Sequence, residues 1–285
     1  MARPPRFGRP NSGTPLADDL FDPKVPTPVV MEKTLFLIHG MWGGPWCWER
    51  YIPFLQSKGY DCIAATLRHH ACDPAVPPNP QVGRTSLLDY AADLELEIRR
   101  LLGTPIIMGH SMGGLLAQML AARGLAERLV LLTPAAPAGI WGITSSVIRG
   151  FLSAQLKWCF WRRPIRPTFN EFVYSSAHLL PPEERKEAYS RLVYDSGRAA
   201  FEMGYWFLDS RRASRVDASR VTCPTLIVGG GRDRITPASV VRKVAARYAR
   251  VATYREFPDH AHWVLAEPGW QDVAEVVGGW LEQCE

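Results

Sequence analysis

From residue 34 onward, short apolar runs bounded by Gly or Pro alternate with longer stretches of helical periodicity. Runs that are apolar throughout suit strands buried on both faces, as in a parallel sheet. We expect strands at Leu35–Ile38, Cys62–Leu67, Ile106–Met108, Leu129–Leu132, Leu226–Val228 and Ala252–Phe257. We expect helices at Trp46–Lys58, Ser86–Leu101, Met112–Leu125, Pro237–Tyr248 and Trp270–Gln283. This alternation predicts an α/β fold with a doubly wound, mostly parallel sheet.

The alternation stops between Pro134 and Asp217, where the pattern is helical and shows no clear strand. Residues 134–216 contain twelve Arg and Lys residues against seven Asp and Glu, and fourteen of the thirty aromatic residues. We interpret residues 134–216 as a helical cap inserted into a core formed by residues 31–133 and 217–285. Residues 1–30 are rich in Pro and Gly, which predicts a poorly ordered N-terminal arm.

Composition and charge narrow the class of protein. The net charge of +5 is mild, and no block of five Lys or Arg residues indicates nucleic-acid binding. The uncharged stretch Leu129–Ile148 is interrupted by Pro and Gly, which argues against a membrane-spanning helix. The N-terminus lacks the apolar core of a signal peptide. Widely spaced cysteines without a CxxC pair are typical of free thiols in a reducing compartment, so we expect a cytoplasmic protein.

A candidate nucleophile follows the third apolar run, in the string Gly109-His110-Ser111-Met112-Gly113. G-x-S-x-G after a strand and before a helix is typical of a sharp turn that exposes the serine hydroxyl. The two glycines are expected where any side chain would meet neighbouring backbone. The helix that begins at Met112 would direct backbone N–H groups at developing negative charge.

With this motif the chain resembles the α/β-hydrolase family of serine esterases, lipases and their relatives, over residues 31–133 and 217–285. The first strand ends in His39-Gly40-Met41-Trp42-Gly43-Gly44. In the family, a His-Gly pair there leads into a loop that donates one backbone N–H to an oxyanion, and the residue after the nucleophile donates another. The resemblance implies that the amides of Met41 and Met112 form the oxyanion hole.

The resemblance also implies a histidine after the last strand and an acid before it. A serine needs a base to take its proton, and the base needs a carboxylate to orient it. His262 precedes Trp263 as the family's catalytic His precedes an aromatic residue, with His260 as the alternative. Asp233 lies in a loop between an apolar run and a helix, where the family has its acid. The alternative for Asp233 is a surface ion pair with its neighbouring arginines.

One segment departs from the family pattern. After the second strand the chain reads Thr66-Leu67-Arg68-His69-His70-Ala71-Cys72-Asp73 in place of Asp-x-x-Gly-x-Gly. His69, His70, Cys72 and Asp73 superficially suggest a metal cluster, but adjacent histidines diverge and no further ligand completes a site. We expect no metal and no cofactor. A structural loop or a pocket role for His69 or His70 stays open.

The cap position and its aromatic residues imply an apolar pocket above the nucleophile. Its expected lining residues are Trp42, His110, Trp141, Trp158 and Trp206. Residues Ile148–Trp161 also fit a helix lying on a lipid surface. A cap helix packed on the core explains the same pattern, so membrane association is not expected. The sequence does not reveal the oligomeric state.

Together these patterns predict a carboxylesterase-type serine hydrolase. Its partner would be a small-molecule ester, lactone or thioester with a medium-sized apolar or aromatic group. Because a fold and a triad do not fix a reaction, two alternatives remain. One is other chemistry on the same triad: C–C bond hydrolysis, hydroxynitrile lysis, acyl transfer or perhydrolysis. The other is a receptor-like module that uses the pocket to bind a ligand.

Overall fold

One parallel sheet organises the core. The structure is a computed structural model that describes residues 33–283, so the predicted arm at residues 1–30 lies outside the described residues. Six parallel strands pair in the order β2-β1-β3-β4-β7-β8. They are β1 (Lys33–Ile38), β2 (Tyr60–Ala64), β3 (Ile106–His110), β4 (Leu129–Leu132), β7 (Thr225–Gly230) and β8 (Ala252–Phe257). The predicted α/β fold and its six strands are confirmed.

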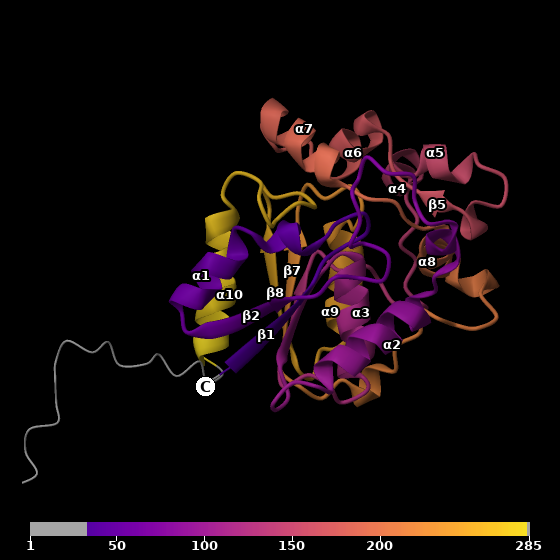
Figure 1. Ribbon diagram of the computed structural model, residues 1–285. Coiled ribbons are helices and arrows are strands. Elements are labelled where there is room, and N and C mark those ends of the chain that lie inside the picture. The colour runs from indigo at the N-terminus through magenta and orange to yellow at the C-terminus, as the bar shows by residue number, and fades with distance from the viewer. Residues whose placement is uncertain (1–32, 284–285) are drawn as a thin grey trace, which may run out of the picture. The chain divides into compact units, whose positions relative to one another are not determined.

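Helices cover both faces of this sheet (Figure 1). On one face lie α1 (Tyr51–Ser57) and α10 (Trp270–Gln283). On the other lie α2 (Leu87–Ile98), α3 (Met112–Ala121) and α9 (Ala238–Arg247). Two 3-10 turns, η1 (Pro45–Trp48) and η2 (Pro80–Arg84), complete the loops before the cap. The helix predicted at 46–58 is therefore split, and Pro53 sits in the first turn of α1, where a missing amide costs no hydrogen bond.

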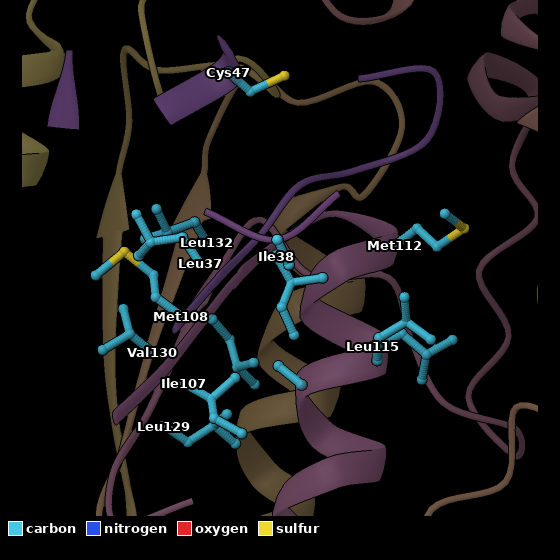
Figure 2. Packing of buried hydrophobic residues seen from close by; sticks show 14 of the residues in the cluster. Leu37, Ile38, Cys47, Ile107, Met108, Met112, Leu115, Leu129, Val130 and Leu132 are labelled. Carbon is cyan, nitrogen blue, oxygen red and sulfur yellow. The ribbon is translucent and has the colours of Figure 1, made fainter. Parts of the chain in front are cut away.

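The sheet alternates its side chains between the two helical layers. Paired residues of neighbouring parallel strands share a face, as do Leu37, Met108 and Val130, whereas Ile107 and Leu129 share the other. Figure 2 shows Ile107 and Leu129 on the side of α3. All five are fully buried. Burial on both faces explains why these strands appear in the sequence as uninterrupted apolar runs.

The inserted segment lies between β4 and β7, beyond the carboxyl ends of the strands (Figure 1). It contains α4 (Ser145–Gly150), α5 (Leu152–Gln155), η3 (Phe160–Arg162), β5 (Pro164–Ile165), α6 (Phe169–Ser175), α7 (Pro182–Arg191), β6 (Asp195–Ser196), α8 (Gly197–Gly204) and η4 (Trp206–Leu208), and η5 (Ala218–Arg220) follows it before β7. The sequence shows no clear strand there, but β5 and β6 form a short antiparallel pair. Two-residue strands are too short to produce a periodic pattern.

Core and cap are not separate bodies. The described residues 33–283 form one compact unit by their contacts. Residues 134–216 are therefore a segment inserted in the sequence. That this segment is a separate domain stays a prediction. None of the helices within residues 33–283 is long and apolar enough to cross a lipid bilayer.

Candidate active site

The turn between β3 and α3 holds Ser111 in a backbone conformation that side chains rarely adopt. Its φ is 54° and its ψ is −120°. The chain can turn this sharply only because its neighbours are small. A Cβ on Gly113 would collide with the carbonyl of Ile38, and one on Gly109 with the backbone of Gly113. The side chain of Ser111 is thereby presented beyond the sheet edge, as the motif predicts.

Three side chains predicted to act together form a continuous chain of hydrogen bonds. Nε2 of His262 lies 2.9 Å from Oγ of Ser111. Nδ1 of His262 lies 2.8 Å from Oδ2 of Asp233. Since an ionised carboxylate only accepts, Nδ1 donates to Asp233 and Nε2 is left to accept from the Ser111 hydroxyl. All three residues are buried, although they come from three loops at the carboxyl edge of the sheet.

Asp233 is held as a carboxylate by more than His262. Its Oδ1 accepts the backbone amides of Ile235 and Thr236, at 2.7 and 2.8 Å. The hydroxyl of Thr236 lies 2.7 Å from Oδ2. Burial would raise the pKa of Asp233, but the positive charge that His262 carries when protonated and these hydrogen bonds outweigh it and lower the pKa. Sequence reasoning missed Thr236, although its place three residues after the acid was a usable signal.

The alternative base, His260, has a different partner. Its Nδ1 lies 3.0 Å from Oε1 of Glu267, which also accepts the amide of Ala261 at 2.8 Å. This pair fixes the loop between β8 and α10. The structure therefore brings His262, and not His260, to Ser111.

The loop after β1 lies against the same serine. A Cβ on Gly40 would come within 2.9 Å of the Cβ of Ser111, so only glycine allows this approach. Met41 follows directly, in a turn closed by a hydrogen bond from the amide of Gly43 to the carbonyl of Gly40. Met112 is the first residue of α3, so its amide has no acceptor within the helix.

A mostly apolar cavity lies over Ser111, between the core loops and the cap. Trp42 and His110 line it, as predicted. The cap contributes apolar side chains from several of its elements. They include Val147, Phe151, Phe160, Phe172, Leu192 and Met203. A substrate over Ser111 would be surrounded mainly by hydrocarbon and aromatic groups.

Three predicted lining residues are absent from the cavity wall. Trp158 is 81% exposed, and Trp141 is 54% exposed and stacks on Phe207. Trp206 packs edge-on against the same ring. The prediction of a pocket role for these three tryptophans was therefore wrong. Residue type alone indicates these tryptophans, whereas the orientation of the cap elements decides which aromatic residues face the nucleophile.

His110 braces the loop of His262. Its Nε2 donates to the carbonyl of His262 at 2.9 Å, and the two rings lie 4.9 Å apart. Burial, followed by the charge of His262, lowers the pKa of His110 to about 3. His110 is therefore neutral in the folded protein at any pH near neutrality.

This lowered pKa predicts a specific acid sensitivity. The unfolded chain protonates His110 near its ordinary pKa of about 6.5, whereas the folded protein does so only near 3. Between these values the unfolded state binds more protons, so stability falls as the pH falls, by up to about 1.4 kcal/mol per pH unit. We expect His110→Gln to reduce this pH dependence in urea unfolding followed by tryptophan fluorescence.

Both proteins should show the same pH dependence above about pH 7, where His110 is neutral in either state. An unchanged slope on acidification would contradict a neutral, buried His110.

The histidine-rich loop after β2 contacts the cap. Within residues 33–283, no group of three or more His, Cys, Asp or Glu side chains is arranged to hold a metal ion. His70 instead turns inward and pairs with Asp195 of the cap, with 3.1 Å between Nε2 and Oδ2.

One family of known proteins matches most of the chain. A family profile described as "Alpha/beta hydrolase family" matches residues 35–276. Among curated proteins, no sequence matches the chain.

Solved structures that resemble the chain include three hydrolases. A pyrethroid hydrolase from Sphingobium faniae JZ-2 is 18% identical, with a TM-score of 0.66 over 88% of this chain and 97% of its own. A methylesterase from Arabidopsis is 13% identical, with a TM-score of 0.64 over 88% and 98%. A monoacylglycerol lipase from Paleococcus ferrophilus is 21% identical, with a TM-score of 0.62 over 87% and 93%. At these identities the likeness establishes the fold alone. Because the family profile spans most of the sequence, the chain belongs to the alpha/beta hydrolase family.

Proposed function

We propose that this protein is a serine esterase that cleaves carboxylic esters of medium-sized apolar or aromatic groups. The observation that carries the proposal is the unbroken chain from Ser111 through His262 to Asp233, with links of 2.9 and 2.8 Å, beneath an apolar cavity. A hydroxyl bonded to a neutral imidazole, which in turn is bonded to a buried carboxylate, is the arrangement that acyl transfer requires.

In the proposed reaction, Oγ of Ser111 attacks the ester carbonyl while Nε2 of His262 takes its proton. The carbonyl oxygen becomes an oxyanion, which the amides of Met41 and Met112 stabilise. Donors of this kind are each worth about 3 kcal/mol in the transition state. His262 then gives its proton to the leaving alcohol, and an acyl group remains on Ser111. Water repeats the sequence and releases the acid.

The lining of the cavity favours uncharged, apolar substrates. Most of its lining side chains are aliphatic or aromatic, and among residues 33–283 no Asp, Glu, Lys or Arg lines it. A charged group would lose its hydration there without gaining a partner. Three of the solved structures that share this fold are named as a pyrethroid hydrolase, a methylesterase and a lipase, which supports ester cleavage as the reaction class.

The proposal is tested with p-nitrophenyl esters of increasing chain length and with a fluorophosphonate probe. We expect hydrolysis with an optimum at medium chain lengths, and mass spectrometry should find the probe on Ser111. Labelling of Ser111 without turnover of any ester, lactone or thioester would instead support a ligand-binding module.

Phe151 offers a test of the pocket. It lines the cavity and packs on Trp42, with ring centroids 5.1 Å apart. We expect Phe151→Ala to open space and to raise the ratio of kcat/KM for octanoate over butyrate by about 10-fold, the usual worth of one or two methylene groups in an apolar pocket. The exposed Trp158 provides the control, since Trp158→Ala should leave the ratio unchanged. An unchanged ratio in Phe151→Ala would place the substrate elsewhere.

A further inference from the structure

The loop of Met41 has a strained backbone that something must hold. Trp42 has a φ of 64°, in the left-handed region that residues with a side chain avoid. Such conformations persist only where surrounding contacts stabilise them. The contacts on the two peptide groups that flank Met41 therefore decide where its amide points.

The first of these peptide groups is held from within the core. The carbonyl of Gly40 accepts hydrogen bonds from Nδ1 of His39 at 2.8 Å and from the amide of Gly43 at 3.3 Å. A carbonyl only accepts, so Nδ1 of His39 carries the hydrogen. Since a peptide group is planar and trans, fixing the carbonyl of Gly40 also fixes the opposite direction of the Met41 N–H.

The second peptide group is held from the cap. The amide of Trp42 donates to Oδ2 of Asp195 at 2.9 Å, across 153 positions of sequence. Asp195 belongs to β6 and is 0% exposed. Its Oδ1 accepts the hydroxyl of Tyr90 at 2.9 Å and the amide of Ser196 at 2.6 Å. One buried carboxylate thus joins the cap, α2 and the loop of Met41.

His70 supplies the counter-charge. Its Nε2 faces Oδ2 of Asp195 at 3.1 Å, and its Nδ1 faces the carbonyl of Arg68 at 3.0 Å. Both partners only accept, so the ring satisfies both only with a hydrogen on each nitrogen, as an imidazolium. Burial alone would lower the pKa of His70, but the charge and hydrogen bond of Asp195 outweigh it, and the pKa is raised.

We propose that the buried Asp195–His70 ion pair positions the Met41 amide for catalysis, so that docking of the cap completes the oxyanion hole. Asp195 is a positioning residue in this view, because it acts on the reacting oxygen only through the loop. The inference rests on the proposed function, in which Met41 is an oxyanion donor.

Replacing Asp195 tests this idea, because an ill-placed donor weakens the transition state more than the bound substrate. Asp195→Asn keeps an acceptor for Trp42 but removes the charge, and Asp195→Ala removes both. Loss of a whole oxyanion donor lowers kcat by about 100- to 1000-fold, so for misplacement we expect about 10-fold in Asn and about 100-fold in Ala. KM should stay nearly unchanged. Binding of a trifluoromethyl ketone, whose adduct with Ser111 carries an oxyanion, should weaken by the same factors.

Glu202 offers a matched control. It too is a fully buried cap carboxylate, but it accepts the amide of Leu87 and the hydroxyl of Ser86 at the start of α2. Glu202→Gln should lower the unfolding temperature and leave kcat and ketone binding at their wild-type values. If Asp195→Ala does not fold, Asp195→Asn and Tyr90→Phe still report on the pair.

Outcomes for this pair can be separated from those for the proposed function. If the wild type hydrolyses esters, folded Asp195 variants with wild-type kcat and ketone affinity would overturn the positioning role. If the wild type hydrolyses no ester, the proposed function fails. A crystal structure of Asp195→Asn then tests whether the ion pair holds the loop of Met41. A changed φ at Trp42 and a turned Met41 amide would support the pair as the element that holds the loop, and an unchanged loop would exclude it.

Discussion

Replacing Ser111 by alanine is expected to abolish hydrolysis of p-nitrophenyl butyrate, with a loss in kcat of about 10⁶-fold. The variant keeps His262 and Asp233 but has no oxygen that can form the acyl-enzyme. Nε2 of His262 then has no hydroxyl to accept from, in place of the bond of 2.9 Å in the native protein. Measurement of kcat and of fluorophosphonate labelling on the same folded preparation checks both consequences.

Ser214 provides a matched serine for comparison. It is also buried, but its hydroxyl donates to the carbonyl of Glu202, away from His262. Ser214→Ala should lose some stability and keep its activity. If Ser111→Ala still hydrolysed the ester at a rate near that of the wild type, another nucleophile would have to carry the reaction.

The fold could be predicted wherever burial leaves a local trace. Strands β3, β4 and β7 are buried on both faces and appear as uninterrupted apolar runs. The edge strand β8 is only partly buried and includes Arg255 and Glu256, so its run is weaker. Helix α2 begins with a capping box of Ser86 and Asp89, which fixes its first turn locally. Each of these signals lies within one element and needs no knowledge of distant residues.

The candidate triad could also be predicted from local sequence motifs. Ser111 lies between closely packed glycines, Asp233 lies in a loop after an apolar strand, and His262 precedes an aromatic residue. Asp195 lies in no such motif, because its partners Trp42, Tyr90 and His70 are between 105 and 153 positions away in sequence. Contacts of this kind arise only when the cap docks on the core. The prediction that three tryptophans of the cap line the pocket was wrong for the same reason, because the packing of the cap on the core decides which side chains face the cavity.

The second large effect is expected at Asp233. In Asp233→Asn the amide oxygen should stay with the backbone amides of Ile235 and Thr236, which now bond Oδ1. The new NH₂ group then faces Nδ1 of His262 as a donor. Nδ1 can accept it only by giving up its hydrogen, which moves to Nε2, so the imidazole can no longer take the proton of Ser111. We expect kcat to fall by about 10⁴-fold.

This loss should come from the tautomer and not from the fold. Asp259 lies exposed on the loop before His262, so Asp259→Asn makes the same chemical change without touching the triad and should keep full activity. The rate at which fluorophosphonate labels Ser111 should fall in parallel with kcat in Asp233→Asn, because both reactions need the same activated hydroxyl. A near-normal rate in Asp233→Asn would mean that another acid orients His262, and the hydrogen bond of 2.8 Å between Asp233 and His262 would then be structural.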